Sequence, residues 1–398
     1  MIRKKSVLLY IIFIWLTSYM ASKYLYKIWY IATFITVIAL VIYFLNKPLP
    51  YKQIIRNSTP LLLYFIFIPV TAIWAFYPEE TLQYFLIDSI YFIVFISFFI
   101  ISMELDINSY EKLFSNLAIS GLIITIIYYL INPYDIRQTG FANQIMIFSA
   151  SFSYLNLKIR TNKLSYFLFG LSVLIILFGN SRRPLLNVTI TILLFELFNQ
   201  RIRIIDFSKK ILFIVVSISI LIIILWQIPP TQNIMLTSVS RLLQSDIEIG
   251  GVFIKAEGKD LMREKINDYA WYLMKNEDLI LGIGYMNFFR WFGLNTTSYE
   301  MVLHNVYQSW LLEMGIIGLF FSFLILYKYF SIILKKLKQI PKFSTEWQFF
   351  TLMLSIMVGL LVGGWYGQLH RNPIFFIALG IVYGMGLSNT NKISNIYK

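Results

Sequence analysis

Apolar runs close in length to a bilayer-spanning helix recur along this chain and constrain its fold more than any other feature. A helix that crosses the hydrocarbon core needs about 20 mostly apolar residues. Runs shorter than this can still cross by tilting or by locally thinning the bilayer. We predict twelve spans, at residues 6–20, 28–45, 60–76, 82–102, 113–131, 142–157, 164–179, 184–198, 211–228, 304–330, 347–364 and 373–387.

The composition agrees with a membrane protein. Of the 398 residues, 58% are hydrophobic and 14% are charged, which excludes an ordinary soluble domain. We therefore predict an all-α, polytopic membrane helical bundle of about 12 spans that forms a single integral membrane domain over residues 1–398. No small-residue cleavage site follows Met20, so we expect the first apolar run to be retained as a span and not removed as a signal peptide.

The positions of Lys and Arg set the predicted orientation. Basic clusters occupy four alternate short loops, which is the bias of cytoplasmic loops. Both termini are then cytoplasmic, and the net charge of +14 needs no nucleic-acid partner. The four loops are 47–56, 158–163, 201–210 and 335–342.

The composition provides few of the residue types that bind metals. The chain has no Cys, which excludes disulfides and cysteine-ligated metals. Its two His residues make a conventional zinc site improbable. We predict no metal and no cofactor.

Residues 229–303 form the only long polar interruption between predicted spans, and we place them outside the membrane as one large extracytoplasmic loop between spans nine and ten. The spacing of Met262, Ile266, Tyr269 and Leu273 predicts short amphipathic helices within it. Such helices can lie on the membrane surface or cap a cavity.

Several cations stand at helix ends on the predicted outer face, which the positive-inside rule otherwise depletes of them. One interpretation is that each side chain reaches a lipid headgroup. The other is that together they bind an anion. These residues are Arg137, Arg182, Arg183, Arg263, Arg290, His304, His370 and Arg371.

Two loops of this face combine arginines with a helix start. Arg182 and Arg183 precede Pro184, which suits a first helical turn, so free N–H groups would lie beside two guanidinium groups. The segment 137–143, from Arg137 to Asn143, is similar in character. An anionic diphosphate at the membrane surface would fit such sites.

Two further elements carry chemistry. Arg263 can donate two hydrogen bonds to one anion, and the later pair Gly282 and Gly284 lets backbone N–H groups approach a ligand. The alternative interpretation is that Arg263 is an ordinary surface arginine and that the two glycines only form a turn. His304 stands where loop becomes helix, and its near-neutral pKa suits a general base, although a capping histidine is the simpler alternative. Asn305 follows it.

The helix after His304 carries Glu313, Gly315 and Gly318. On a straight helix Glu313 lies roughly opposite His304, so the two should not share a ligand. A carboxylate at membrane depth normally pairs with a cation or a hydroxyl, so we predict a structural, supporting role for Glu313. Gly315 and Gly318 are predicted to permit close helix approach.

In order and spacing, Arg263, Gly282-x-Gly284, His304-Asn305 and Glu313-x-Gly315-x-x-Gly318 resemble the O-antigen ligase and Wzy-type polysaccharide polymerase superfamily. The loops Arg137-x-x-Gly140 and Ser181-Arg182 are similar to two further elements of that family. Arg183 departs from the pattern, because a small residue commonly follows the first arginine.

This resemblance implies a metal-independent, GT-C-like glycosyltransferase of the bacterial cytoplasmic membrane, with its active site on the outer face. The donor would be a glycan on undecaprenyl diphosphate. His304, Arg263 and Arg182 would be the catalytic residues, with Arg182 and Arg263 on the diphosphate. We predict that the substrate is contacted by Arg137, Arg183, Asn305, Gly282, Gly284 and Arg371.

Three functions remain open at this point. A polymerase joins repeat units into O-antigen, capsule or exopolysaccharide, whereas a ligase transfers a finished glycan to lipid A core or protein. A composition rich in Ile, Lys, Asn, Tyr and Phe is typical of low-GC bacteria and favours the polymerase. A transporter or flippase of lipid-linked glycan also suits twelve spans, but no repeated half is visible. Expected partners are the bilayer, the lipid-linked donor and acceptor, and a chain-length regulator or flippase.

Overall fold

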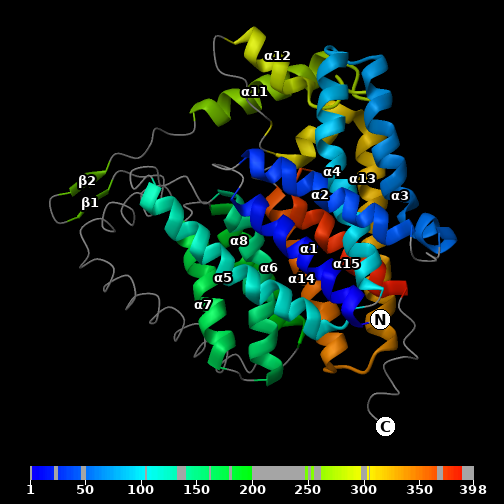
Figure 1. The fold of residues 1–398 in the computed structure, drawn as a ribbon. Coiled ribbons are helices and arrows are strands. Elements are labelled where there is room, and N and C mark those ends of the chain that lie inside the picture. Colours follow the sequence, from blue (N-terminus) through cyan, green and yellow to red (C-terminus); the bar gives the residue numbers. More distant parts are fainter. Residues whose placement is uncertain are drawn as a thin grey trace.

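Helices dominate the computed structural model of the chain (Figure 1). The structure describes residues 2–21, 26–45, 51–103, 105–131, 140–160, 163–178, 182–199, 247–249, 252–254, 261–296, 303, 305–364 and 371–387. Eleven of the twelve predicted spans coincide with helices of the structure. The ninth, 211–228, lies outside the described residues.

The described elements begin and end at the following residues. The first eight helices are α1 (Ile2–Met20), α2 (Tyr26–Leu45), α3 (Tyr51–Val70), α4 (Pro78–Ser102), α5 (Ile107–Ile131), α6 (Gly140–Arg160), α7 (Lys163–Phe178) and α8 (Arg182–Phe198), with the short 3₁₀ helix η1 (Thr71–Ile73) after α3. The later helices are α11 (Leu261–Asn276), α12 (Asn287–Asn295), α13 (Val306–Gln339), α14 (Thr345–Gly364) and α15 (Pro373–Leu387).

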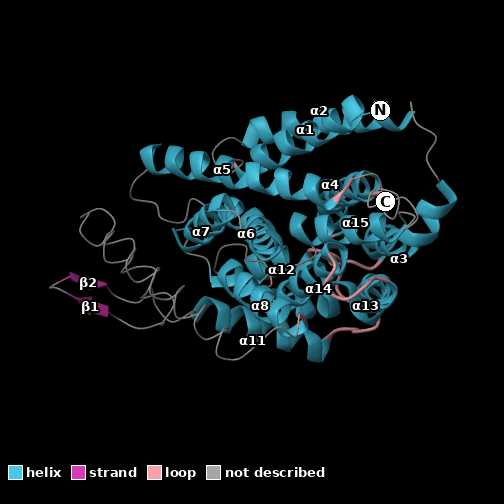
Figure 2. Ribbon diagram, turned by 90° about the horizontal axis from the view of Figure 1, so that it is seen from below, coloured by secondary structure: helices cyan, strands magenta, loops and turns pink. Residues whose placement is uncertain are grey.

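The all-α prediction needs one small correction. Strands β1 (Ile247–Ile249) and β2 (Val252–Ile254) pair antiparallel as a short hairpin, with Ile247 opposite Ile254. This hairpin belongs to the predicted outer loop and is drawn away from the helices in Figure 2. The same stretch of sequence contains α11, at the residues whose apolar spacing predicts a helix, and α12.

Length and hydropathy identify the chain as a helical membrane protein. Five described helices are long and apolar enough to cross a membrane, and three more are apolar but shorter. The total of twelve spans and their orientation remain predictions. The five are Ile54–Ile73, Pro78–Ser102, Ile107–Tyr128, Val306–Gln339 and Thr345–Gly364, and the shorter ones are Leu9–Met20, Lys163–Leu177 and Pro373–Leu387.

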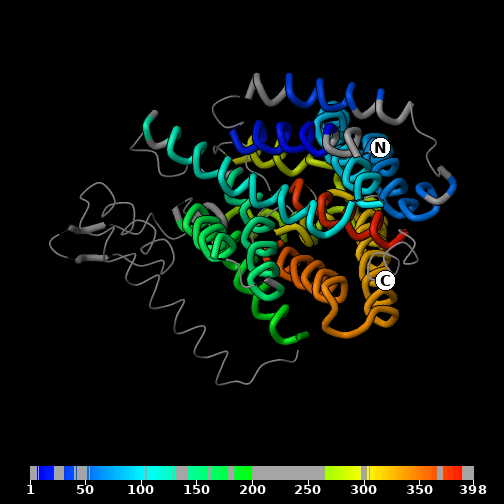
Figure 3. The backbone as a smooth tube through the Cα atoms, turned by 60° about the horizontal axis from the view of Figure 1, so that its bottom comes forward, coloured from blue at the N-terminus to red at the C-terminus, as the bar shows by residue number. Residues whose placement is uncertain are grey.

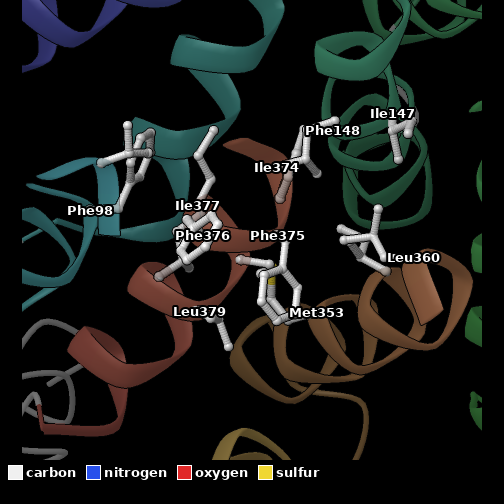
Figure 4. Packing of buried hydrophobic residues seen from close by; sticks show 14 of the residues in the cluster. Phe98, Ile147, Phe148, Met353, Leu360, Ile374, Phe375, Phe376, Ile377 and Leu379 are labelled. Carbon is white, nitrogen blue, oxygen red and sulfur yellow. The ribbon is translucent and has the colours of Figure 1, made fainter. Parts of the chain in front are cut away.

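Helix α15 lies in the centre of the bundle. It is apolar on all sides, as expected for a helix surrounded by protein, and its residues from Pro373 to Met385 are buried. Figure 4 shows its side chains between those of α4, α6 and α14. Gly384 lets α4 approach closely, because an added Cβ would lie 2.1 Å from the carbonyl oxygen of Phe99.

The remaining helices surround this centre in two orientations. In Figures 1 and 2, α1, α2 and α5 run across the bundle, whereas α3, α4 and α13 stand side by side at a steep angle to them. Helices α6, α7 and α8 form a second group that packs on α14 (Figure 3). Helices α11 and α12 lie at one end of the bundle, beside the starts of α4 and α13.

Candidate functional site

Helix α13 is broken at Gly315. Gly315 has φ +69° and ψ −173°, a backbone conformation that is open essentially to glycine alone. The break removes the normal intrahelical partners, so the N–H of Ile316 donates to the carbonyl of Leu279, outside the helix, at 2.8 Å. The break lies after Glu313, so the helix is regular from Val306 to Met314 and departs from a straight course only beyond them.

The segment around Gly282 and Gly284 fills the break. The N–H of Ile283 donates to the carbonyl of Leu312 at 2.9 Å, and the N–H of Gly284 donates to that of Glu313 at 3.0 Å. Gly282 donates within its own turn, to Asp278. These three N–H groups, which we expected to face a ligand, therefore bond to protein, and the glycines serve to dock the outer loop onto α13.

Close contact explains why the segment needs glycine at this point. Gly282 has φ +75°, and a Cβ on it would lie 2.5 Å from the backbone nitrogen of Gly315. A Cβ on Gly315 would lie 2.2 Å from the carbonyl oxygen of Ile280. The close neighbour of Gly315 is thus the loop segment and not a second membrane helix, and the nearest side chain to Gly318 is Met314 of its own helix.

Glu313 joins this break to α12. Its carboxylate is buried, accepts a hydrogen bond from the hydroxyl of Ser309 at 2.5 Å, and accepts from the backbone N–H groups of Met286 and Phe288. Those two groups lie at the N-terminus of α12, where Met286 offers no capping side chain. Glu313 therefore caps α12 from another helix.

A buried ion pair holds Arg371 against α4. The Arg371 Nε lies 2.9 Å from Asp88 Oδ2, and the Tyr285 hydroxyl donates to the same oxygen at 2.6 Å. The Arg371 guanidinium also lies 4.9 Å from the centroid of the Tyr84 ring. Burial alone would lower the pKa of Arg371, but the Asp88 carboxylate more than offsets this and raises it above its ordinary value.

This pairing changes the expectation for Arg371. Sequence analysis treated it as a free cation for substrate, whereas Asp88 neutralises it and fixes α15 to α4 and to the segment after Gly284. The same segment is bonded to the start of α4 through Asn287, whose amide nitrogen donates to the Thr81 hydroxyl at 2.7 Å. The loop, α4, α13 and α15 thus meet in one hydrogen-bonded junction.

Asn305 begins α13 as its N-cap. Its side-chain oxygen accepts from the N–H of Tyr307 at 2.9 Å and from that of Gln308 at 3.4 Å. A capping role satisfies two of the donors that a helix start leaves free. The structure therefore engages this oxygen internally, which argues against the substrate contact predicted for it. His304, the predicted base, lies outside the described residues.

Arg183 differs from Arg371 in having no counterion among the residues that the structure describes. Its side chain is largely buried in the first turn of α8, ahead of the apolar stretch, and its Nε and one terminal nitrogen make no hydrogen bond. Burial lowers its pKa to about 10, so it stays protonated at neutral pH. A buried, unpaired guanidinium costs free energy unless an anion joins it. Among the described arginines of the predicted outer face, Arg183 best meets the requirement for anion binding.

The structure places the other predicted arginines only in part. Arg182 begins α8 and Arg263 lies in the first turn of α11, but their side chains are not described. Arg137 lies outside the described residues. Their predicted roles remain predictions.

Asp88 and Asn187 were not predicted from the sequence, and Asn143 was predicted only as part of the segment 137–143. Asp88 carried a visible signal, since an acidic residue inside an apolar run needs a partner. Asn143 and Asn187 are buried, with both amide atoms of each unbonded. Nothing in the sequence around Asn143 and Asn187 distinguishes them from other polar residues near the start of a helix.

A comparison with protein families decides the relationship. A sequence model of the O-antigen ligase family matches residues 167–323, from α7 through α8, α11 and α12 into α13. Residues 167–323 belong to the O-antigen ligase superfamily. The matched stretch contains Arg183, the Gly282 to Gly284 segment and the broken part of α13. No curated protein matches the chain.

The match over residues 167–323 supports, in general terms, a membrane enzyme of the O-antigen ligase or polymerase type. It confirms the resemblance seen in the residues. It does not separate a ligase from a polymerase, and it does not favour a transporter.

Proposed function

We propose that this protein is a polysaccharide polymerase, which joins undecaprenyl-diphosphate-linked repeat units on the outer face of the cytoplasmic membrane. The observation that carries the proposal is the family match over 167–323, which includes the broken helix α13 and the arginines of α8. The unpaired Arg183 supports it, because a diphosphate leaving group needs cations beside it.

The proposed reaction is a glycosyl transfer. A hydroxyl of the acceptor glycan attacks the anomeric carbon of the donor glycan, and the bond from that carbon to the diphosphate oxygen breaks. His304 takes the proton of the attacking hydroxyl. Arg182, Arg183 and Arg263 bind the diphosphate as negative charge develops on it. The electron pair of the broken bond leaves with the diphosphate, so no metal or nucleotide is needed in the balance.

The junction around Glu313 has a defined part in this proposal. It fixes the outer-loop segment that contains α11 and α12 to the helix that follows His304. Arg263 lies on α11, and the GxG segment docks at the break in α13. Docking would therefore hold Arg263 and His304 in a constant relation, which is the positioning that glycosyl transfer requires.

The test is the size profile of lipid-linked and surface glycans in cells that lack the protein. We expect single repeat units to accumulate on the lipid carrier outside, with His304→Ala and Arg263→Ala unable to restore long chains. Lys265→Ala is the matched control, because Lys265 is exposed on the same helix as Arg263 and should restore them.

Other outcomes separate the alternatives. Long chains stranded on the lipid carrier would indicate a ligase. Repeat units trapped on the inner face would indicate a transporter. An unchanged profile would contradict glycosyl transfer altogether.

A further inference from the structure

Among the described residues, three polar side chains with unbonded atoms lie at one end of the second helical group, which comprises α6, α7 and α8. Asn143 on α6 and Asn187 on α8 are 0% and 1% exposed, and neither amide atom of either residue makes a hydrogen bond. Arg183 precedes Asn187 by one helical turn, on the same face of α8. Buried polar groups are nearly always bonded, so the unbonded atoms of these three side chains call for a ligand.

The register of α6 on α8 brings these residues to one level. The Tyr154 hydroxyl of α6 donates to Glu196 of α8 at 2.5 Å, and this bond aligns the two helices at their far ends. Asn143 precedes Tyr154 by about three full turns and so shares its face. The same number of residues before Glu196 on α8 leads to the turn between Arg183 and Asn187. The two helices pack on each other, so Asn143 is level with that turn.

Helix α14 packs closely against the Asn187 side chain through Gly363. A Cβ on Gly363 of α14 would lie 1.9 Å from Asn187 Oδ1, so no side chain of any size fits there. The last turn of α14 also contacts the start of α13, where the Tyr307 hydroxyl donates to the carbonyl of Leu361 at 2.8 Å. The Asn187 amide and Tyr307, at the start of α13, thus contact the same turn of α14.

The chemistry of the three groups selects one kind of ligand. Each amide offers an N–H₂ donor and a carbonyl acceptor, and both are unused. Phosphate oxygens at neutral pH only accept, and a polyprenyl chain does neither. A sugar hydroxyl both donates and accepts, so it can satisfy both atoms of an asparagine. The guanidinium of Arg183 adds a donor for an anion on the same face of α8.

We propose that Asn143 and Asn187 bind hydroxyl groups of the sugar ring attached directly to the diphosphate, while Arg183 binds the diphosphate itself. This inference rests on the proposed function. It makes the asparagine pair a specificity site, because a carrier lipid without that sugar leaves the amides unbonded.

The test compares two ligands on purified protein in detergent. One is the lipid-linked repeat unit extracted from cells that lack the protein, and the other is undecaprenyl diphosphate without sugar. The readout is the ligand concentration that gives half of the maximal thermal stabilisation. Asn143→Leu and Asn187→Leu keep the side-chain shape and remove both polar atoms. Asn199→Leu is the control, since its amide lies at the other end of α8 and already donates to Phe195.

We expect each Leu variant to raise the half-saturating concentration of the glycosylated lipid about three- to tenfold, the value of one to two uncharged hydrogen bonds. The sugar-free lipid should bind as it does to the wild type. The unliganded variants should melt at the same temperature or higher, because two unbonded buried polar atoms have gone. Asn199→Leu should leave both lipids unaffected.

Several results would overturn the inference. These are an unchanged response to the glycosylated lipid, an equal loss for both lipids, or a lower melting temperature with normal binding, which indicates a purely structural role. Asn→Ser variants give the same comparison if a Leu variant does not fold. A wild-type protein that responds to neither lipid would instead contradict the proposed function, which keeps the two failures distinct.

Discussion

Removing the charge of Asp88 while keeping its shape, by Asp88→Asn, should destabilise the protein through Arg371. Asp88 lies in α4 and its side chain is 3% exposed, while that of Arg371 is 21% exposed. The substitution leaves the guanidinium largely buried without a counterion. It also weakens the bond from the Tyr285 hydroxyl, which donates to the same carboxylate oxygen.

The magnitude follows from the burial of the pair. Breaking a buried ion pair by removing one partner costs about 3–5 kcal/mol. Arg371 retains some solvent and its contact with the Tyr84 ring, so we expect a cost at or below the bottom of that range, about 2–3 kcal/mol. Removing both charges, in Asp88→Asn with Arg371→Gln, should cost less than the sum of the single changes, because no unpaired charge remains.

The assay is thermal unfolding of the purified protein in detergent. At about 1–2 °C per kcal/mol for a chain of this size, Asp88→Asn should lower the midpoint by roughly 2–6 °C. The control Asp268→Asn, at an exposed position of α11, should change it by less than about 1 °C. A single variant as stable as the wild type, or a double variant whose loss equals the sum, would refute the reasoning.

Three further substitutions test the site. Gly315→Ala should cost about 3 kcal/mol or more, because φ is +69° and the new Cβ would meet the Ile280 carbonyl, and a lower unfolding midpoint would check this. Glu313→Ala should cost about 2–4 kcal/mol by leaving the N-terminus of α12 and Ser309 unbonded, and limited proteolysis should then cut near α12 sooner than in the wild type. Arg183→Met should raise the unfolding midpoint of the unliganded protein and lower its activity. Arg371→Met should instead lower the unfolding midpoint, because it leaves the Asp88 carboxylate without its partner. An Arg183→Met protein that is less stable but fully active would contradict the role given to this arginine.

The positions of the helices were readable from the sequence because hydropathy depends on local composition. Every predicted span that falls on described residues coincides with a helix. The boundaries were less accurate where charge continues a helix past its apolar part. Helix α13 was predicted to end at residue 330 but runs to Gln339, since Lys335, Lys336 and Lys338 extend it beyond the apolar stretch.

The junction at Gly315 could not be predicted, because it depends on contacts between distant segments. The sequence pattern Gly282-x-Gly284 is equally typical of a loop that binds a ligand and of a turn that packs against another part of the protein. Only the bonds from Ile283 and Gly284 to the carbonyls at the break decide between them. The same holds for Arg371, whose partner Asp88 lies far away in the chain.

The measurement that tests the central claim most directly is product length in a reconstituted system. Purified protein in liposomes is mixed with lipid-linked single repeat units, and the lipid-linked products are separated by size over time. The account predicts a ladder that grows by one repeat unit, with release of undecaprenyl diphosphate at each step and no ladder with His304→Ala. Lipid-linked units that remain single in the presence of folded wild-type protein would contradict it.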